Sequence, residues 1–327
     1  MIKHIRTVTA IIGLFGGIPV LFLVLLTQPM LFPAKQELTA GVSTQALRGH
    51  VIQLSEKLPR RSDDTDKLDF SARYIKNQLS QYGSVEEHIY EVWGVPYRNV
   101  SITIGPKSRQ RIVIGAHYDS FHGNPGADDN ASGVAGLLEL ARLLSLELLT
   151  IPVQLIAYTL EEPPYFRSQD MGSAVHAKQL KTDNIDVVAM ISLEMIGYYT
   201  DDPNSQDYPI PLLSLIYPTK GNFIAIVGNL TGAGLVRQAK SSMASAMSLP
   251  VVSVNAPSIL PGVDFSDHLN FWNHGYPAIM VTDTAFYRNK AYHSEDDTWD
   301  QLDYEKMGEV VKGVYAVVIN LARREVQ

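Results

Sequence analysis

The sequence predicts an α/β fold with three layers (α/β/α), in which a central mixed, mostly parallel sheet lies between two helical layers. Two observations lead to this prediction. Short, nearly continuous apolar runs alternate with segments of helical periodicity along most of the 327-residue chain. Such runs are typical of inner strands that are covered on both faces. No internal repeat divides this pattern, so we expect one large domain over residues 46–327.

The first expected element is a membrane helix at the N-terminus. Val8–Leu26 contains no charged side chain, whereas Lys3 and Arg6 come before it. At about 1.5 Å rise per residue, a helix of this length nearly spans a hydrocarbon core of about 30 Å. We therefore expect residues 7–28 to be a transmembrane helix in the lipid bilayer, retained as an anchor or uncleaved signal.

This helix sets the expected topology of the chain. Residues 1–6 would be a cytoplasmic N-terminus, and residues 29–45 a linker to the domain. Positive residues before the span place the following domain on the far side of the membrane. The expected protein is thus single-pass, with its domain outside the cytoplasm, in the periplasm if the membrane is a bacterial inner membrane.

Strands and helices are then expected in alternation. The first helix is indicated by the spacing of Phe70, Tyr74, Ile75, Leu79 and Tyr82. Strands are expected at the segments NVSITIG (99–105), RIVIGA (111–116), VQLIAYTL (153–160), DVVAMISL (186–193), FIAIVG (223–228) and PAIMVTD (277–283). Further helices are expected over Val134–Leu144 and after Asp303, which is a suitable N-cap for the last one.

Composition limits the chemistry. A net charge of -7 and the absence of any Lys/Arg-rich run give no basic field, so we expect no nucleic-acid partner. The chain has no cysteine, which excludes disulfides, thiolate ligands and a cysteine nucleophile. A metal site would therefore use histidines and carboxylates.

Histidines and carboxylates follow four of the expected strands. His117 and Asp119 follow the strand at 111–116, two residues apart, so that Asp119 is placed to fix the tautomer of a ligating imidazole. The segment GADDNASG (126–133) carries two aspartates directly before a helix, where N-capping is an alternative reading. Spacing alone does not separate Asp128 from Asp129.

The other strand ends carry further acidic groups. Glu161 and Glu162 end the strand at 153–160, an arrangement that suits one ligand beside one general base. Glu194 follows the next strand, and His293 lies in the segment YHSEDDTWD (292–300). Solvated turns, with Asp296 and Asp297 as turn caps, are the alternative readings. Because the strand ends converge on one edge, we expect two Zn²⁺ ions sharing a carboxylate, with Mn²⁺ or Co²⁺ left open.

The motifs AHYDS, GADDNASG, EE, SLEMIGY and YHSEDDT occur here in the order found in the M28 family of zinc peptidases, which the chain resembles from about Arg48 to Ala322. That resemblance implies the zinc-peptidase, phosphorylase/hydrolase-like fold. It also implies an aminopeptidase that removes residues from peptides with a free N-terminus. The resemblance further implies which residues bind the two metal ions. His117 and Glu194 would bind one ion, Glu162 and His293 would bind the other, and Asp129 would bridge the two.

The resemblance also implies catalytic roles. Glu161 would deprotonate the metal-bridging water and later protonate the leaving amine, and Tyr292 resembles a position that polarises the carbonyl in some members. Glu194 departs from the aspartate of many members, and EEPPYF (161–166) departs from a glycine-containing loop. The longer side chain of Glu194 leaves the metal spacing and metal preference open, and the EEPPYF loop leaves the shape of the substrate pocket open.

Two other functions remain as alternatives. SDHLNFW (266–272) is similar to a stretch of the glutaminyl cyclases, which share the fold and bind one zinc ion. A catalytically inactive domain that serves as a receptor or scaffold is the other alternative, although the apparent retention of all five ligands and the base favours an enzyme. The segment Thr200–Lys220 would be either a loop that covers the cleft or a neutral insertion.

Overall fold

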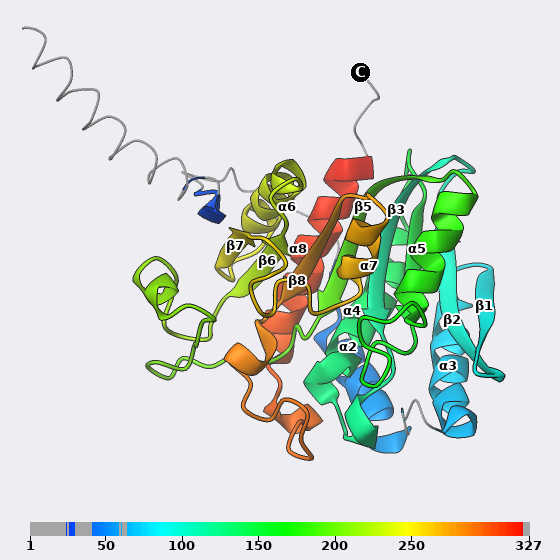
Figure 1. Ribbon diagram of the computed structural model, residues 1–327, viewed down its shortest axis with the longest axis horizontal. Helices are drawn as coiled ribbons and strands as arrows, with labels where there is room; N and C mark the ends of the chain where they lie inside the picture. The colour runs from blue at the N-terminus through cyan, green and yellow to red at the C-terminus, as the bar shows by residue number, and fades with distance from the viewer. Residues whose placement is uncertain (1–23, 25, 30–40, 59, 61–63, 323–327) are drawn as a thin grey trace, which may run out of the picture.

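The computed structural model describes residues 24, 26–29, 41–58, 60 and 64–322. Its centre is one sheet with the strand order β1-β2-β4-β3-β5-β8-β6-β7 (Figure 1). The strands are β1 Val85–Val92, β2 Val95–Ile104, β3 Gln110–His117, β4 Val153–Tyr158, β5 Asp186–Glu194, β6 Ile224–Gly228, β7 Val251–Asn255 and β8 Ala278–Thr282. The pairs β3–β4, β3–β5, β5–β8 and β6–β7 are parallel, and the other three are antiparallel. The predicted mixed, mostly parallel sheet is confirmed.

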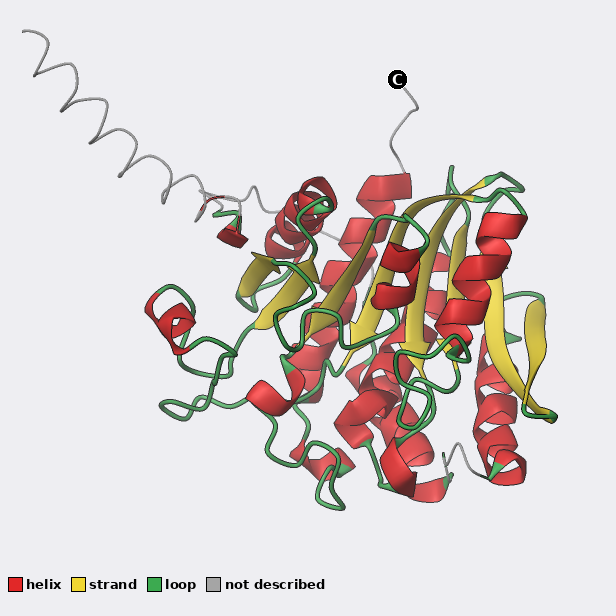
Figure 2. Cartoon of the chain, in the orientation of Figure 1, coloured by secondary structure: helices red, strands yellow, loops and turns green. Residues whose placement is uncertain are grey.

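Helices cover both faces of the sheet, as Figure 2 shows. They are α2 Thr44–Ile52, α3 Thr65–Leu79, α4 Gly133–Leu144, α5 Gly172–Thr182, α6 Ala233–Ala246, α7 His268–Asn273 and α8 Tyr304–Ala322. α5 and α7 lie on one face, while α4 and α6 contact the other and α2 and α8 pack beside them. Every residue of β4 and β8 is buried, which explains why their sequences are almost continuously apolar. The three-layer prediction is therefore confirmed.

The ends of the sheet differ from the prediction. β1 and β7 were not among the expected strands, and both lie at the edges of the sheet. In β1 only Val92 is buried, the other positions are half-buried or exposed, and three are glutamates, so that β1 lacks the apolar run that marked the inner strands. The helix indicated by this spacing is α3, in which Ile75 and Leu79 are buried, whereas Phe70 is 50% exposed and Tyr82 lies beyond the last turn. Asp303 does cap α8, because its carboxylate accepts the backbone N–H of Lys306 at 3.0 Å.

The N-terminal prediction falls largely outside the described residues. Of the expected membrane segment 7–28, the structure describes only Val24 and residues 26–28. Within the described part of the chain, no helix combines the length and apolarity needed to cross a bilayer. The globular part begins with α2 at Thr44, two residues before the expected start of the domain.

Candidate metal centre

The predicted site residues meet where β3, β4 and β5 end. These strands are parallel neighbours, so their carboxyl ends lie at the same edge of the sheet. Leu160 has φ of 60°, in the left-handed region, and interrupts the alternation of side chains after β4. Glu161 and Glu162 both face the site as a result, which a regular strand would not allow.

Five side chains form two overlapping groups of candidate metal ligands. One group contains His117, Asp129 and Glu194, and the other contains Asp129, Glu162 and His293. Within each group the ligand atoms lie within 4.8 Å of one another. These groups have the same members as the two sets that the family resemblance implied, including the shared aspartate.

Asp129 lies between the two groups with one carboxylate oxygen towards each. Oδ1 is 3.3 Å from His117 Nε2, and Oδ2 is 3.2 Å from His293 Nε2. Glu194 Oε1 lies 3.5 Å from His117 Nε2, and Glu162 Oε2 lies 3.2 Å from His293 Nε2. Asp129 therefore has the geometry of a bridging ligand.

The donor set fits metal ions. His117 Nε2 and Glu162 Oε1 are buried and accept or donate no hydrogen bond in the described part of the chain. Buried polar atoms without partners are costly, and several buried carboxylates together are costlier still. Nitrogen and oxygen donors without sulfur, at this spacing, are suitable for zinc. Cations between the two groups would satisfy both the unpartnered atoms and the negative charge.

Protonation in this cluster is strongly perturbed. Burial and the neighbouring Asp129 together raise the pKa of Glu162 to about 7, against the opposing effect of His293. Burial lowers the pKa of His293, but Asp129 and Glu162 outweigh burial and raise it to about 9. Burial likewise opposes ionisation of Asp129, yet the two histidines hold its pKa below the usual range. Metal binding to such a cluster must release protons.

Adjacent Asp128 has a different role. Its Oδ1 accepts the backbone N–H of Gly197 at 2.9 Å, and its Oδ2 accepts an N–H from the Asn289 side chain at 3.0 Å. Asp128 is in neither ligand group. The N-cap reading of this segment belongs instead to Asn130, whose side-chain oxygen accepts the N–H of Gly133 at the start of α4.

Asp119 supports the site through two kinds of contact. Its carboxylate accepts the backbone N–H groups of Glu161 and Glu162 at 3.2 and 3.1 Å. Its main-chain oxygen lies 3.2 Å from His117 Nδ1, whereas its nearest carboxylate oxygen is 3.6 Å away. The geometry thus assigns the orientation of the imidazole to the backbone oxygen, and the carboxylate to holding the paired glutamates.

The predicted base and the predicted tyrosine also lie at the site. Glu161 Oε2 is 3.9 Å from His117 Nε2, and burial raises the pKa of Glu161 well above its usual range while His117 opposes that shift. The ring of Tyr292 stacks on His293 with centroids 3.8 Å apart. Burial and the carboxylates raise the pKa of Tyr292, so the phenol stays protonated and able to donate.

Three supporting residues were not assigned such roles from the sequence. Ser266 donates from Oγ to Glu194 Oε2 at 2.7 Å. Phe121 stacks on the face of His293, with centroids 3.9 Å apart and ring planes 5° apart. Asp297, expected only as a turn cap, accepts the N–H groups of Asp128 and Asp129 at 3.0 Å each. In the sequence, the only indications of these roles were the motif SDH, which begins at Ser266, and the motif DD, which ends at Asp297.

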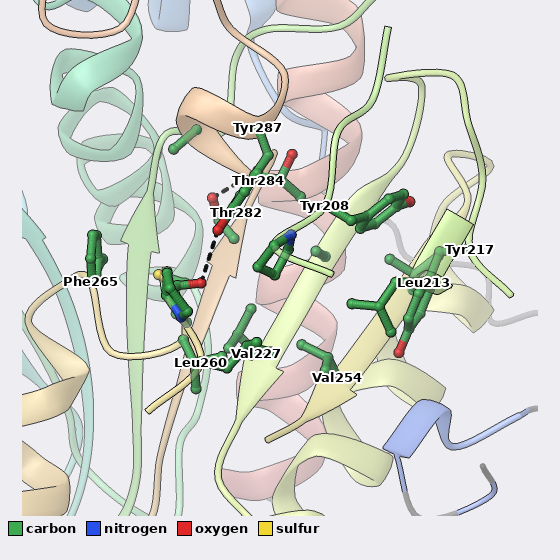
Figure 3. A pocket seen from close by; sticks show the side chains of 18 of the residues that line it. Tyr208, Leu213, Tyr217, Val227, Val254, Leu260, Phe265, Thr282, Thr284 and Tyr287 are labelled. Carbon is green, nitrogen blue, oxygen red and sulfur yellow. Dashed lines mark hydrogen bonds between the residues drawn. The ribbon is translucent and has the colours of Figure 1, made fainter. Parts of the chain in front are cut away.

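An apolar cavity of about 110 Å³ opens beside Glu194. Its floor is formed by β6, β7 and β8, with Val227 and Val254 pointing into it (Figure 3). Leu260 and Phe265 line one side, and Leu213 with two tyrosines lines the other (Figure 3). The latter come from segment 200–220, which is therefore a wall of the cavity.

Comparison with known proteins agrees with this geometry. The model of Peptidase family M28 matches residues 99–318, which cover most of the chain. The chain belongs to peptidase family M28. It is accordingly a hydrolase that acts on peptide bonds. The family match indicates a metal cofactor, and the two groups of candidate ligands are the residues of this chain that are placed to hold one.

The chain is 51% identical to the protein YfbL of Escherichia coli K12 over 80% of this chain and 83% of that protein. It is 30% identical to leucine aminopeptidase 1 of Ajellomyces capsulatus strain G186AR, over 84% of this chain and 74% of the relative. Among solved structures, LapB from Legionella pneumophila has a TM-score of 0.69 at 22% identity, over 86% and 73% of the two chains. Glutaminyl cyclase of Bacteroides thetaiotaomicron has a TM-score of 0.65 at 16% identity, over 86% and 99%. The fold alone thus fits both a peptidase and a cyclase.

Proposed function

We propose that this member of the M28 family is a two-zinc aminopeptidase that removes apolar residues from the free N-terminus of peptides. The observation that carries this proposal is the pair of ligand groups that share Asp129 and lie beside a buried glutamate that is not in either group. His117 and Glu194 would hold one ion, and Glu162 and His293 the other. Zinc bound there would supply Lewis-acid chemistry and would lower the pKa of a water molecule that it binds.

Glu161 is the proposed general base. Its carboxylate is buried at 3.9 Å from His117 Nε2, so it lies at the site without belonging to either group. Burial raises its pKa, which makes it a stronger base and allows it to return the proton to the leaving amine. Tyr292, a protonated phenol stacked on His293, would donate to the oxygen of the scissile carbonyl.

The cavity beside Glu194 would receive the side chain of the first residue of the substrate. It begins at a metal ligand and is lined mainly by aliphatic and aromatic side chains, such as Val227, Leu213 and Phe265. Burying an apolar side chain there is favourable, whereas a charged side chain would be desolvated without a partner. The relative named leucine aminopeptidase 1 is consistent with this preference.

The decisive test uses zinc-loaded protein and a mixture of free, N-acetylated and glutamine-initiated peptides, followed by mass spectrometry. Stepwise loss of residues from free N-termini is expected, and Glu161→Gln should reduce the rate at least ~100-fold while retaining zinc. Equal hydrolysis of N-acetylated peptides would contradict the aminopeptidase assignment. Ammonia loss from glutamine-initiated peptides alone would make the protein a cyclase, and no reaction would favour a scaffold.

A membrane location completes the proposal. Val8–Leu26 is free of charge and follows Lys3 and Arg6, which supports a single-pass anchor with the peptidase domain outside the cytoplasm. In a bacterial inner membrane this domain would face the periplasm. Protease protection in intact cells tests the orientation, and a cytoplasmic C-terminal domain would contradict it.

A further inference from the structure

Segment 208–217 presents an unusual apolar surface. Its sequence, YPIPLLSLIY, contains no charged residue. It includes the short helical turn Pro211–Leu215, in which Leu212 is 70% and Leu215 77% exposed. Ile210 and Ile216 on either side are also exposed. Leu213 points into the apolar cavity, which explains why one face of the turn is apolar. The cavity does not explain why the exposed face of the turn is apolar as well.

A second observation places the start of the described chain at the same end of the sheet. Ser253 in edge strand β7 donates from Oγ to the main-chain oxygen of Thr27 at 2.8 Å. The main-chain oxygen of Ser253 accepts the hydroxyl of Tyr217 at 2.8 Å. One residue of β7 therefore binds both the N-terminal segment and the apolar segment.

The N-terminal segment is held there by further contacts. Lys240 of α6 donates to the main-chain oxygens of Thr27 and Gln28 at 2.7 and 3.1 Å. The side chain of Gln28 is buried, donates to the main-chain oxygen of Ala233 at 3.0 Å and accepts from Arg237 at 3.1 Å. These contacts fix residues 27–28 against α6 and β7 (Figure 1).

The sequence leaves no spacer between this attachment and the apolar run. Val8–Leu26 ends one residue before Thr27. If that run spans the bilayer, as proposed above, the contacts of Thr27 hold the β7 end of the sheet at the membrane surface. The exposed leucines of the 208–217 segment lie at that end, and an uncharged, apolar turn flanked by tyrosines suits the interface between headgroups and acyl chains.

We propose that the 208–217 segment inserts Leu212 and Leu215 into the membrane interface and is a second, shallow point of contact beside the N-terminal anchor. This inference rests on the proposed anchor and not on the proposed peptidase activity. Because Leu213 and Tyr217 of the same segment line the cavity, the wall of the substrate pocket lies next to the bilayer.

The test uses full-length protein in phosphatidylcholine and phosphatidylglycerol vesicles. The chain has no cysteine, so Leu215→Cys provides a single labelling position for an environment-sensitive fluorophore. The matched control is Leu148→Cys, because Leu148 is a fully exposed leucine between α4 and β4, far from β7 in the sheet order. Emission from position 215 should shift to shorter wavelength and be quenched by lipids with a nitroxide near the headgroup. Position 148 should report water.

Flotation of the vesicles separates the two parts of the inference. Protein that floats with the vesicles while both labels report water would overturn the contact and leave the anchor intact. Protein that does not float would overturn the contact together with the anchor. A label at position 215 that is shielded without lipid quenching, and increasingly so at higher protein concentration, would assign the segment to a second copy of the chain and overturn the proposal. Catalysis is not measured, so failure here is distinct from failure of the peptidase assignment.

Discussion

Asp297 supports the proposed bridging ligand Asp129 from a distant loop, and we expect its replacement to destabilise the folded protein. Its carboxylate is the acceptor for the backbone N–H groups of Asp128 and Asp129, both buried. Asp297→Ala leaves two buried donors without a partner, each costing roughly 1–3 kcal/mol. We expect the free energy of unfolding to fall by about 4 kcal/mol, and bound zinc to decrease because the bridging carboxylate is no longer fixed.

The assay is urea unfolding at pH 8.5 in the presence of EDTA, which separates the loss of hydrogen bonds from the loss of metal. At this pH Asp297 is ionised, because burial raises its pKa only to about 7. With a slope near ~3 kcal/mol per molar urea, the midpoint should fall by about 1–2 M. Zinc content by mass spectrometry of the EDTA-free protein completes the comparison.

The control is the neighbouring aspartate. Asp296 is exposed, and Asp296→Ala should change stability by no more than about 0.5 kcal/mol. Asp297→Asn should give an intermediate loss, because an amide has one acceptor oxygen in place of two. Equal midpoints for the two alanine variants would refute the role assigned to Asp297.

Three further predictions concern the ligands, the cavity and the pH dependence of folding. Ser266→Ala removes the hydrogen bond to Glu194 and should weaken zinc binding roughly 10- to 100-fold in a competition titration. Val227→Phe fills the cavity and should lower kcat/KM for leucyl substrates at least ~10-fold relative to alanyl substrates. Burial raises the pKa of Asp267 to about 7, so the folded apoprotein binds a proton that the unfolded chain has lost. Stability should therefore fall as pH rises from about 4 to 7, and Asp267→Asn should remove a loss on the order of 2–4 kcal/mol.

Each of these has an outcome that would contradict it. Unchanged zinc affinity in Ser266→Ala would mean that Glu194 needs no support from its neighbour. An equal loss of leucyl and alanyl hydrolysis in Val227→Phe would show that the cavity does not receive the side chain. For Asp267, a wild-type stability curve in EDTA that is parallel to that of the asparagine variant between pH 4 and 7 would exclude the proposed titration.

His117, Glu162 and Glu194 could be predicted as candidate ligands from the sequence because they lie at or just after the ends of buried strands. Apolar runs mark β3, β4 and β5, and parallel order brings the ends of such strands to one edge. His117 and Glu194 are the last residues of their strands, so their placement needs no knowledge of a loop. The placement of both Glu161 and Glu162 at the site could not be derived from strand periodicity. It depends on the left-handed backbone conformation of Leu160, which the sequence does not indicate.

The apolar cavity was not predictable in the same way. It lies on a face shared by β6, β7 and β8, and β8 pairs antiparallel with β6. β7 lacked a recognisable apolar run, and the side walls come from two loops with no regular periodicity. No local pattern relates segment 200–220 to Phe265, since only the folded sheet brings them together. The sequence therefore offers no basis for proposing a side-chain preference, and the proposal made above depends on the cavity.

The two aspartates at 128 and 129 show most directly where local reasoning ends. Both follow the same glycine and both are buried, yet their pKa values move in opposite directions. Burial and the nearby carboxylate of Asp283 raise the pKa of Asp128, which favours a protonated, structural carboxyl group. At Asp129 burial is outweighed by His117 and His293, so this side chain is the ionised one that can bridge cations. The groups that make this difference include Asp283 and His293, more than 150 residues away along the chain. What distinguishes Asp129 from Asp128 as the candidate bridging ligand is consequently a property of tertiary structure, and in the sequence only the resemblance to a family indicated it.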